Sequence, residues 1–70
     1  MKIKIGDSVE TLVDKTFEEG IDKKVFIPKG TNGLVCEIYD GWALIEIYNQ
    51  HDAPNARNVY DYLMNEFKII

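Results

Sequence analysis

The amino-acid sequence predicts a small all-β domain in which five to six short antiparallel strands close, or nearly close, into a barrel. Two β-rich apolar runs within residues 27–48 flank Asp40-Gly41, and an Asp-Gly pair between such runs is typical of a β-hairpin. The other apolar runs are short, and turn-forming residues separate them.

The register of this hairpin follows from its own residues, if Asp40 and Gly41 are the two turn residues and both have positive φ. Side chains then alternate between two faces. The face expected in the core is apolar throughout: Leu34, Cys36, Ile38, Ala43, Ile45 and Ile47. The face expected outside is mixed: Val35, Glu37, Tyr39, Trp42, Leu44, Glu46 and Tyr48. A shift by one residue would turn both glutamates toward the core, so the pattern supports this register.

The first strand is expected in the N-terminal residues. Residues 1–5 alternate between apolar and lysine side chains, which favours a strand. We expect it to continue into residues 8–13 past a bulge at Gly6. The second part would place three β-branched side chains on one face: Val9, Thr11 and Val13.

Residues 14–24 are the least regular part of the sequence. Their charges follow no period, so we expect one long loop after the first strand, held by Phe17 and Ile21. The alternative is a single helical turn that begins at Thr16 and ends at Gly20.

The remaining segments alternate between strands and turns. Residues 25–27 form a β-prone run that Pro28 ends, and residues 29–33 contain two glycines and an asparagine for a turn. Residues 49–58 are polar and predict an exposed loop. The expected closing elements are a strand at 59–62, a short helical (3-10) turn at 63–66 and a strand at 67–70.

Length and composition limit the classes of protein. The 70 residues suffice for one domain, residues 1–70, with a small core. The single cysteine excludes an internal disulfide and fits a cytoplasmic protein. We expect no signal peptide, membrane span or lipid anchor. The net charge of −4, from 12 acidic residues against 8 lysines and arginines, disfavours a general nucleic-acid binder.

Three stretches that together span nearly the whole chain carry a resemblance to a known fold. They are Ile5-Gly6-Asp7-Ser8-Val9, Pro28-Lys29-Gly30-Thr31-Asn32-Gly33-Leu34-Val35 and Glu66-Phe67-Lys68-Ile69-Ile70. The chain resembles the SH3-like barrels, in particular small uncharacterised bacterial proteins related to the SH3-like part of the nitrile hydratase β subunit. Residues 29–35 are also similar to the KOW motif of ribosomal and transcription-factor domains. Such glycine and valine patterns imply a fold far more than a function.

Catalysis and metal binding have little support in the sequence. The one histidine, His51, precedes Asp52, but no nucleophile is placed near this pair by sequence. Cys36 is expected in the core, where its thiolate would be suppressed. No acids or histidine have a known ligand spacing, and the glycines of residues 29–33 precede a strand where a phosphate loop would open a helix. We therefore expect no enzyme, metal or cofactor.

The outward face of the hairpin is the strongest candidate for function. Its aromatic and aliphatic stripe is Tyr39, Trp42, Leu44 and Tyr48, with Glu37, Asp40 and Glu46 at the rim. Because Trp and Tyr are favoured anchors at protein interfaces, we expect a protein partner there, or a second copy of the chain. Residues 49–58, including His51 and Asp52, would adjust specificity. Alternatively, residues 14–24 fold over the stripe and make it core.

Three functions follow from these expectations. The first is a non-enzymatic protein–protein interaction module, of the accessory, immunity or inhibitor type known among small acidic bacterial and phage domains. The second is a KOW-like nucleic-acid-binding domain that uses basic residues, with tyrosines and Trp42 for stacking. Its basic residues would be Lys23, Lys24, Lys29 and Arg57. The third is an enzyme accessory or small-molecule-binding domain.

Overall fold

The structure is a computed structural model that describes residues 2–18, 20–47 and 58–70. This part of the chain is all-β, as predicted, with a single 3-10 turn before the last strand. The strands are β1 (Ser8–Thr11), β2 (Lys15–Glu18), β3 (Lys24–Ile27), β4 (Asn32–Tyr39), β5 (Trp42–Ile47), β6 (Val59–Leu63) and β7 (Phe67–Ile69), and the 3-10 turn is η1 (Met64–Glu66). Within the described ranges no helix has the length and apolar character of a membrane span.

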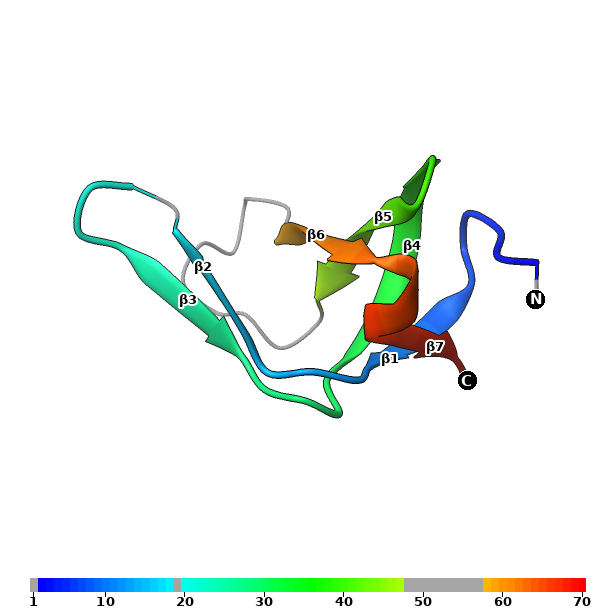
Figure 1. Cartoon of the computed structure of the whole chain (residues 1–70), viewed down its shortest axis with the longest axis horizontal. Coiled ribbons are helices and arrows are strands. Elements are labelled where there is room, and N and C mark those ends of the chain that lie inside the picture. Colours follow the sequence, from blue (N-terminus) through cyan, green and yellow to red (C-terminus); the bar gives the residue numbers. More distant parts are fainter. Residues whose placement is uncertain (1, 19, 48–57) are drawn as a thin grey trace.

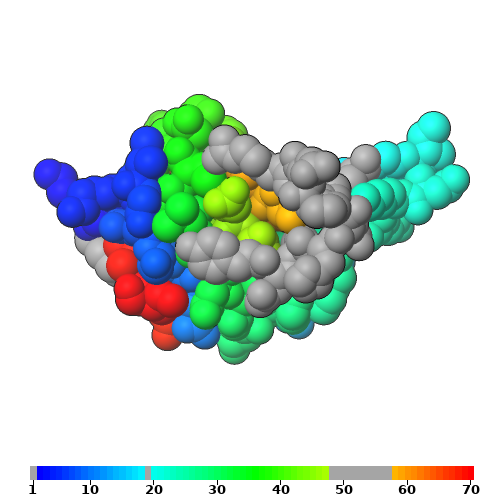
Figure 2. All heavy atoms as spheres, turned by 180° about the vertical axis from the view of Figure 1, so that it is seen from behind, coloured from blue at the N-terminus to red at the C-terminus, as the bar shows by residue number. Residues whose placement is uncertain are grey.

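The strands form two antiparallel sheets. Five of them make one sheet in the order β6-β5-β4-β1-β7, and β2 pairs with β3 in a separate hairpin. Figures 1 and 2 show this hairpin projecting at the end of the molecule opposite the C-terminal strand. The long axis of the molecule, 37 Å against 22 Å for the other two, reflects that projection.

The core lies between the two sheets. Its buried side chains come from both: Val9, Val25, Ile27, Val35, Ala43, Ile45, Ile47, Tyr60, Tyr62 and Phe67. Phe17 of β2 is partly buried against them. Burial of this apolar surface is the main term that stabilises the fold.

The one buried polar residue among those described, Thr11, has hydrogen-bond partners. Its Oγ1 donates to the Pro28 carbonyl oxygen (3.1 Å) and accepts from the Thr31 N–H (3.0 Å). The backbone N–H of Gly30, which has a φ of 90°, donates to the Thr11 carbonyl oxygen (2.8 Å). The predicted turn after Pro28 is therefore fixed against β1.

The predicted hairpin is present, but its register changes at a bulge. Tyr39 opposes Trp42 and Ile38 opposes Ala43 as predicted, whereas beyond the bulge between Val35 and Glu37 it is Val35 that opposes Ile45. A bulge inserts one residue and bends the strand. Val35 is consequently buried, while Leu34 and Cys36 are only half-buried, so their predicted core positions are wrong.

Two positions of this hairpin require glycine, Gly33 because there is no space for a side chain and Gly41 because its φ is positive. Gly33 lies on the core face, where a Cβ would come within 2.6 Å of both the Glu46 carbonyl oxygen and Ile45 Cγ2. Gly41 has a φ of 85°, but no described residue other than glycine has positive φ. The prediction of positive φ at Asp40 is therefore wrong, and Gly41 alone supplies the left-handed position of the turn.

The N-terminal residues form a turn where a strand was predicted. The Asp7 carboxylate accepts a hydrogen bond from the Lys4 N–H (2.8 Å), and Gly6 has a φ of 96°. This local bonding competes with extension of the chain, so the first strand begins only at Ser8. The predicted inward positions of Val9 and Thr11 are confirmed.

Residues 14–24 do follow the first strand, but they are not one irregular loop or a helical turn. They contain β2 and the first residue of β3, whose register pairs Thr16 with Phe26. Phe17 packs on the core as predicted, whereas Ile21 is fully exposed between the two strands and anchors nothing. The alternation was hidden because one inward position is Lys15, a charged residue.

Candidate interaction surface

The solvent side of β4, β5 and β6, here called the outer face, carries three rows of side chains. Directly opposed residues in antiparallel strands share a face, so the pairing of the strands defines each row. The rows are Tyr39–Trp42–Leu63, Glu37–Leu44–Asp61 and Leu34–Glu46–Val59. The outer face is thus apolar at the end nearest the Asp40-Gly41 turn and mixed beyond it.

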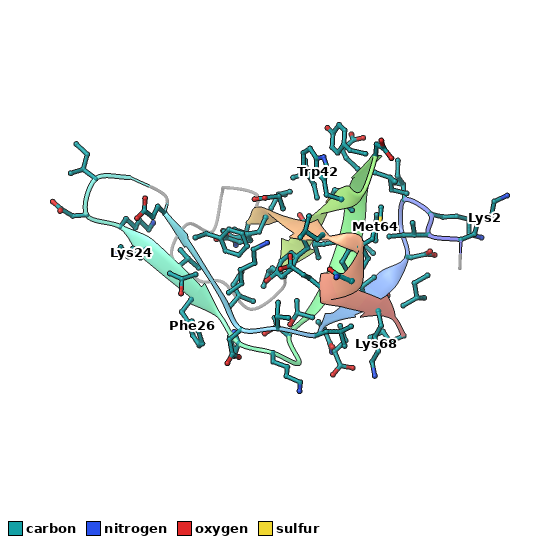
Figure 3. All side chains as sticks on the ribbon, in the orientation of Figure 1. Lys2, Lys24, Phe26, Trp42, Met64 and Lys68 are labelled. Atoms are coloured by element: carbon teal, nitrogen blue, oxygen red, sulfur yellow. The ribbon has the colours of Figure 1, made fainter. Side chains whose placement is uncertain are left out.

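The first row is an apolar strip in which Tyr39 and Leu63 are exposed and Trp42, between them, is half-buried. The Tyr39 and Trp42 rings are stacked, with centroids 4.3 Å apart and planes inclined by 16°. Tyr39 is 44% exposed and Leu63 is 53% exposed. Figure 3 shows Trp42 near the tip of the β4–β5 pair, far from Phe26 on the projecting hairpin. A strip of this kind matches the aromatic anchors that protein interfaces favour.

A shallow hollow joins the first two rows. Trp42 and Leu44 line it from β5, and Asp61 and Leu63 line it from β6. Three of its walls are apolar and the fourth ends in a carboxylate. This combination suits a side chain with an apolar stem and a polar or cationic end.

The remaining positions of the outer face are rich in acids. Glu37 and Asp61 are exposed and stand on the two sides of Leu44, while Glu46 is half-buried between Leu34 and Val59. No row contains a lysine or arginine. In the described part of the chain the outer face therefore combines apolar and negative character.

The structure brings together three of the predicted partner-binding residues. Tyr39, Trp42 and Leu44 share the outer face, whereas Tyr48, His51 and Asp52 lie outside the described residues. The alternative that residues 14–24 cover the stripe is wrong. Phe17 of that segment packs on Tyr60 and Tyr62 (ring centroids 4.8 and 5.6 Å apart), which alternate with Asp61 and Leu63 and face the core.

Sequence reasoning missed the contribution of β6 to this surface. Leu63 was assigned to the helical turn, and Asp61 to a strand of unknown neighbours. The signal was the period-two alternation of Val59, Asp61 and Leu63 with the two tyrosines. This alternation does not reveal that β6 pairs with β5, and it is that pairing that places Leu63 opposite Trp42.

A charged cluster lies behind the outer face and holds the β2–β3 hairpin to the main sheet. Lys15 Nζ donates to Glu66 Oε1 (2.8 Å) and to the Asp61 carbonyl oxygen (3.0 Å). It also lies 4.9 Å from the Tyr62 ring centroid and 5.3 Å from that of Phe17. Glu66 Oε1 accepts a second bond, from the Leu63 N–H (2.8 Å). We call this cluster the Lys15 clasp.

The clasp changes the ionisation of two side chains. Burial raises the pKa of Glu66, but the hydrogen bonds from Lys15 and Leu63 and the nearby ammonium charge outweigh burial, so its pKa lies below the ordinary 4.5. Burial, with a smaller contribution from the Glu66 charge, raises the pKa of Tyr62 to about 12. The Tyr62 hydroxyl is buried and has no hydrogen-bond partner among the described residues. Both groups contact Lys15, which belongs to the β2–β3 hairpin.

The basic residues predicted for nucleic-acid binding are not gathered with the exposed aromatic strip. Lys23 and Lys24 lie at the outer end of the β2–β3 hairpin, and Lys24 is paired in register with Glu18. Lys29 follows the opposite end of β3. Arg57 lies outside the described residues. The described lysines therefore form no track beside stacking side chains.

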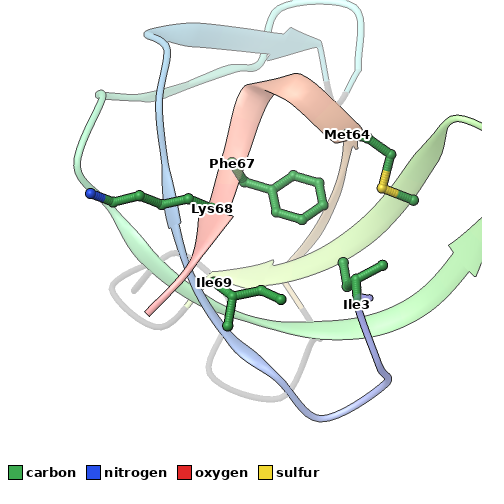
Figure 4. Close-up of a pocket in the computed structure, with 5 residues that line it drawn as sticks. All are labelled: Ile3, Met64, Phe67, Lys68 and Ile69. Carbon is green, nitrogen blue, oxygen red and sulfur yellow. The ribbon is translucent and has the colours of Figure 1, made fainter. Parts of the chain in front are cut away.

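Three further features of the described residues were candidates for a site in the sequence or the structure. No group of three or more metal-ligating side chains is present in them. The half-buried Cys36 lies at the bulge, where its thiol donates to the Leu34 carbonyl oxygen (3.7 Å). A small hollow of about 150 Å³ is lined by Ile3, Met64, Phe67, Lys68 and Ile69. Figure 4 shows the Lys68 ammonium directed away from its apolar walls.

Comparisons with protein-family models, curated proteins and solved structures find no match to this chain.

Proposed function

We propose that this protein is an SH3-like domain without enzymatic activity that works as a protein–protein interaction module through its outer face. The observation that carries the proposal is the apolar strip formed by Tyr39, Trp42 and Leu63, in which Tyr39 and Leu63 are exposed and Trp42 is half-buried. A small domain gains stability by burying such side chains, so an exposed cluster is typical of an interaction site. Cytoplasmic location and an accessory, immunity or inhibitor role in bacteria or phages are parts of the same proposal.

Charge favours a protein partner over a nucleic acid. Phosphate contacts need basic residues beside the stacking side chains. The two rows that follow the strip on the outer face instead hold Glu37, Glu46 and Asp61. Negative carboxylates beside Trp42 would repel a phosphate backbone, whereas they complement the basic groups of a protein.

The test is affinity capture from lysate of the source organism with the tagged protein, with and without nuclease, read by mass spectrometry. We compare Trp42→Ala with Phe26→Ala, since Phe26 is an aromatic residue of the projecting hairpin and is 57% exposed. We expect a defined protein that survives nuclease, is lost with Trp42→Ala and is retained with Phe26→Ala. Capture of nucleic acid that moderate salt removes would instead favour the nucleic-acid-binding function.

A fold control accompanies the capture. Thermal unfolding of Trp42→Ala must stay near that of the original protein, because a large loss of stability would make Trp42 a core residue. Leu63→Ser provides a second variant at the same strip, and its exposed side chain makes little contribution to stability. Binding that survives both substitutions would contradict the proposed site.

A further inference from the structure

The arrangement of charges on the outer face restricts the chemistry of the partner. We infer that the outer face binds a protein segment carrying two cationic side chains on either side of an apolar one. This inference rests on the proposed function and specifies its partner. It follows from the second row, in which two exposed carboxylates, Glu37 and Asp61, flank Leu44.

These carboxylates form no ion pair with the other described residues. The described ion pairs, Lys15 with Glu66 and Lys68 with Glu10, include neither Glu37 nor Asp61. Lys15 does approach Asp61, but it bonds to the backbone carbonyl oxygen and forms no ion pair with the carboxylate. Two negative charges therefore remain beside an apolar hollow, where an apolar partner without cations would leave them poorly solvated.

The spacing of the row indicates how a partner would lie on it. Glu37 and Asp61 occupy the strands on the two sides of β5, so their backbones are about 10 Å apart, twice the usual distance between strands. In a helix, residues i and i+7 are about 10.5 Å apart and share a face with residues i+3 and i+4. In an extended chain, side chains on one face repeat at about 6.6 Å. A helix laid across the strands matches the row more closely.

The first row of the outer face also fits a helical partner. The strip of Tyr39, Trp42 and Leu63 runs parallel to the acidic row and would contact the apolar side of such a helix. A cation placed at Asp61 would reach the Trp42 face through the hollow that both residues line. The occupant is thus a basic amphipathic helix whose apolar side chains lie on the strip.

The probe is a phage-displayed library of random 15-residue peptides, selected on the full chain and counter-selected on Trp42→Ala. We expect enriched peptides to carry Lys or Arg at positions seven apart with an apolar residue between them. Replacing those two cations with neutral citrulline, or Glu37→Gln with Asp61→Asn in the protein, should weaken binding about 3- to 10-fold at low salt. Glu18→Gln with Asp22→Asn, an equal charge change on the β2–β3 hairpin, should leave affinity unchanged.

Each other result overturns the inference, and the results separate it from the proposed function. Peptides that need Trp42 but bind equally to the protein with Glu37→Gln and Asp61→Asn would overturn the basic partner and leave the interaction surface standing. A dimer in analytical ultracentrifugation that Trp42→Ala dissociates would make a second copy the occupant. Competition by a DNA or RNA oligonucleotide would make it a nucleic acid. No enrichment, or equal binding to Trp42→Ala, would overturn both the inference and the proposed function.

Discussion

The two hairpins of this protein are alike in their backbones and different in how they are held. The β4–β5 pair sits inside the five-stranded sheet, with backbone hydrogen bonds to β1 on one side and β6 on the other. The β2–β3 pair has no strand partner in the described structure beyond itself, and its inner side chains attach it. Phe17 packs on two tyrosines, and Lys15 bonds to Glu66 and Asp61.

This difference determines which surface is available for binding. β5 is attached to the core by Ala43, Ile45 and Ile47, which are buried on its inner side. The side chains on its outer side, Trp42 and Leu44, are not required for this attachment and remain partly exposed. β2 must use its inner side for attachment, including one charged residue. We therefore expect stability to respond strongly to core substitutions in β5, to pH at the clasp, and weakly to changes on the outer face.

The largest expected effect is that of Ile45→Ala. Ile45 is fully buried in β5, so truncation removes apolar contacts and leaves a cavity. We expect the free energy of unfolding to fall by about 2–5 kcal/mol, measured by urea denaturation. Thr16→Ala, at an exposed position of β2, is the control and should change it by less than about 0.5 kcal/mol. If Ile45→Ala and Thr16→Ala lowered the free energy of unfolding equally, the buried side of β5 would contribute no more to stability than an exposed position of β2.

Alkaline pH should weaken the attachment of the β2–β3 hairpin at Tyr62. The pKa of this phenol rises from 10.0 to about 12 on folding, so between these values the unfolded chain releases the proton and the folded chain keeps it. The contribution of Tyr62 to the free energy of unfolding is fully present below pH 10. It is lost as pH rises, by about 2–3 kcal/mol near pH 12. Urea denaturation at pH 9 and 11 measures the first part of this loss, about 1–1.5 kcal/mol.

Tyr62→Phe provides the control for the alkaline effect. Its hydroxyl has no hydrogen-bond partner among the described residues, so its removal should be neutral or stabilising at pH 7. The variant should also lose the part of the pH dependence that belongs to Tyr62. An unchanged slope between pH 9 and 11 would assign the alkaline loss to another group.

The Lys15 clasp should contribute less to the free energy of unfolding than Ile45 or Tyr62, and its contribution should be lost at acid pH. Lys15→Met keeps the apolar stem against Phe17 but leaves Glu66 without its ammonium partner, so we expect a loss of about 1–2 kcal/mol at pH 7. The folded pKa of Glu66 is depressed, so its stabilisation is present above pH 4.5 and is lost as pH falls through the folded value. Urea denaturation between pH 7 and 3 measures both effects.

A double-mutant cycle isolates the pair. Lys15→Met and Glu66→Gln should together cost less than the sum of the single substitutions, by about 1 kcal/mol. Lys15→Met should also flatten the dependence on pH below 4.5. Strict additivity would mean that the two side chains stabilise the hairpin independently.

The sequence predicted the elements of the sheet better than their mutual positions. The Asp40-Gly41 hairpin and the closing strand–turn–strand follow from alternation and turn residues, which are local. The bulge was not predictable because Leu34, Val35 and Cys36 are all apolar, and either register places an apolar residue in the core. β2 was missed because Lys15 stands at an inward position, where partners distant in the sequence, Glu66 and the Asp61 carbonyl oxygen, make a charge acceptable.

The candidate site was predictable only in part, for the same reason. Tyr39 and Trp42 are neighbours across a two-residue turn, so local register places them together. Leu63 and Asp61 join them only through the pairing of β6 with β5, which is a long-range contact. The acidic row that restricts the partner's chemistry therefore becomes visible only when three strands are ordered.

The smallest expected effect lies on the outer face itself. Tyr39→Ala removes a ring that is stacked on Trp42 and 44% exposed, so we expect a loss of only about 0.5–1 kcal/mol in urea denaturation. Phe26→Ala, which removes an exposed ring without a described ring partner, should cost less. A loss of several kcal/mol at Tyr39 would show that the strip stabilises the fold. A small loss means that the exposed Tyr39 ring adds little to the stability of the domain, and binding then remains the better reason for its presence.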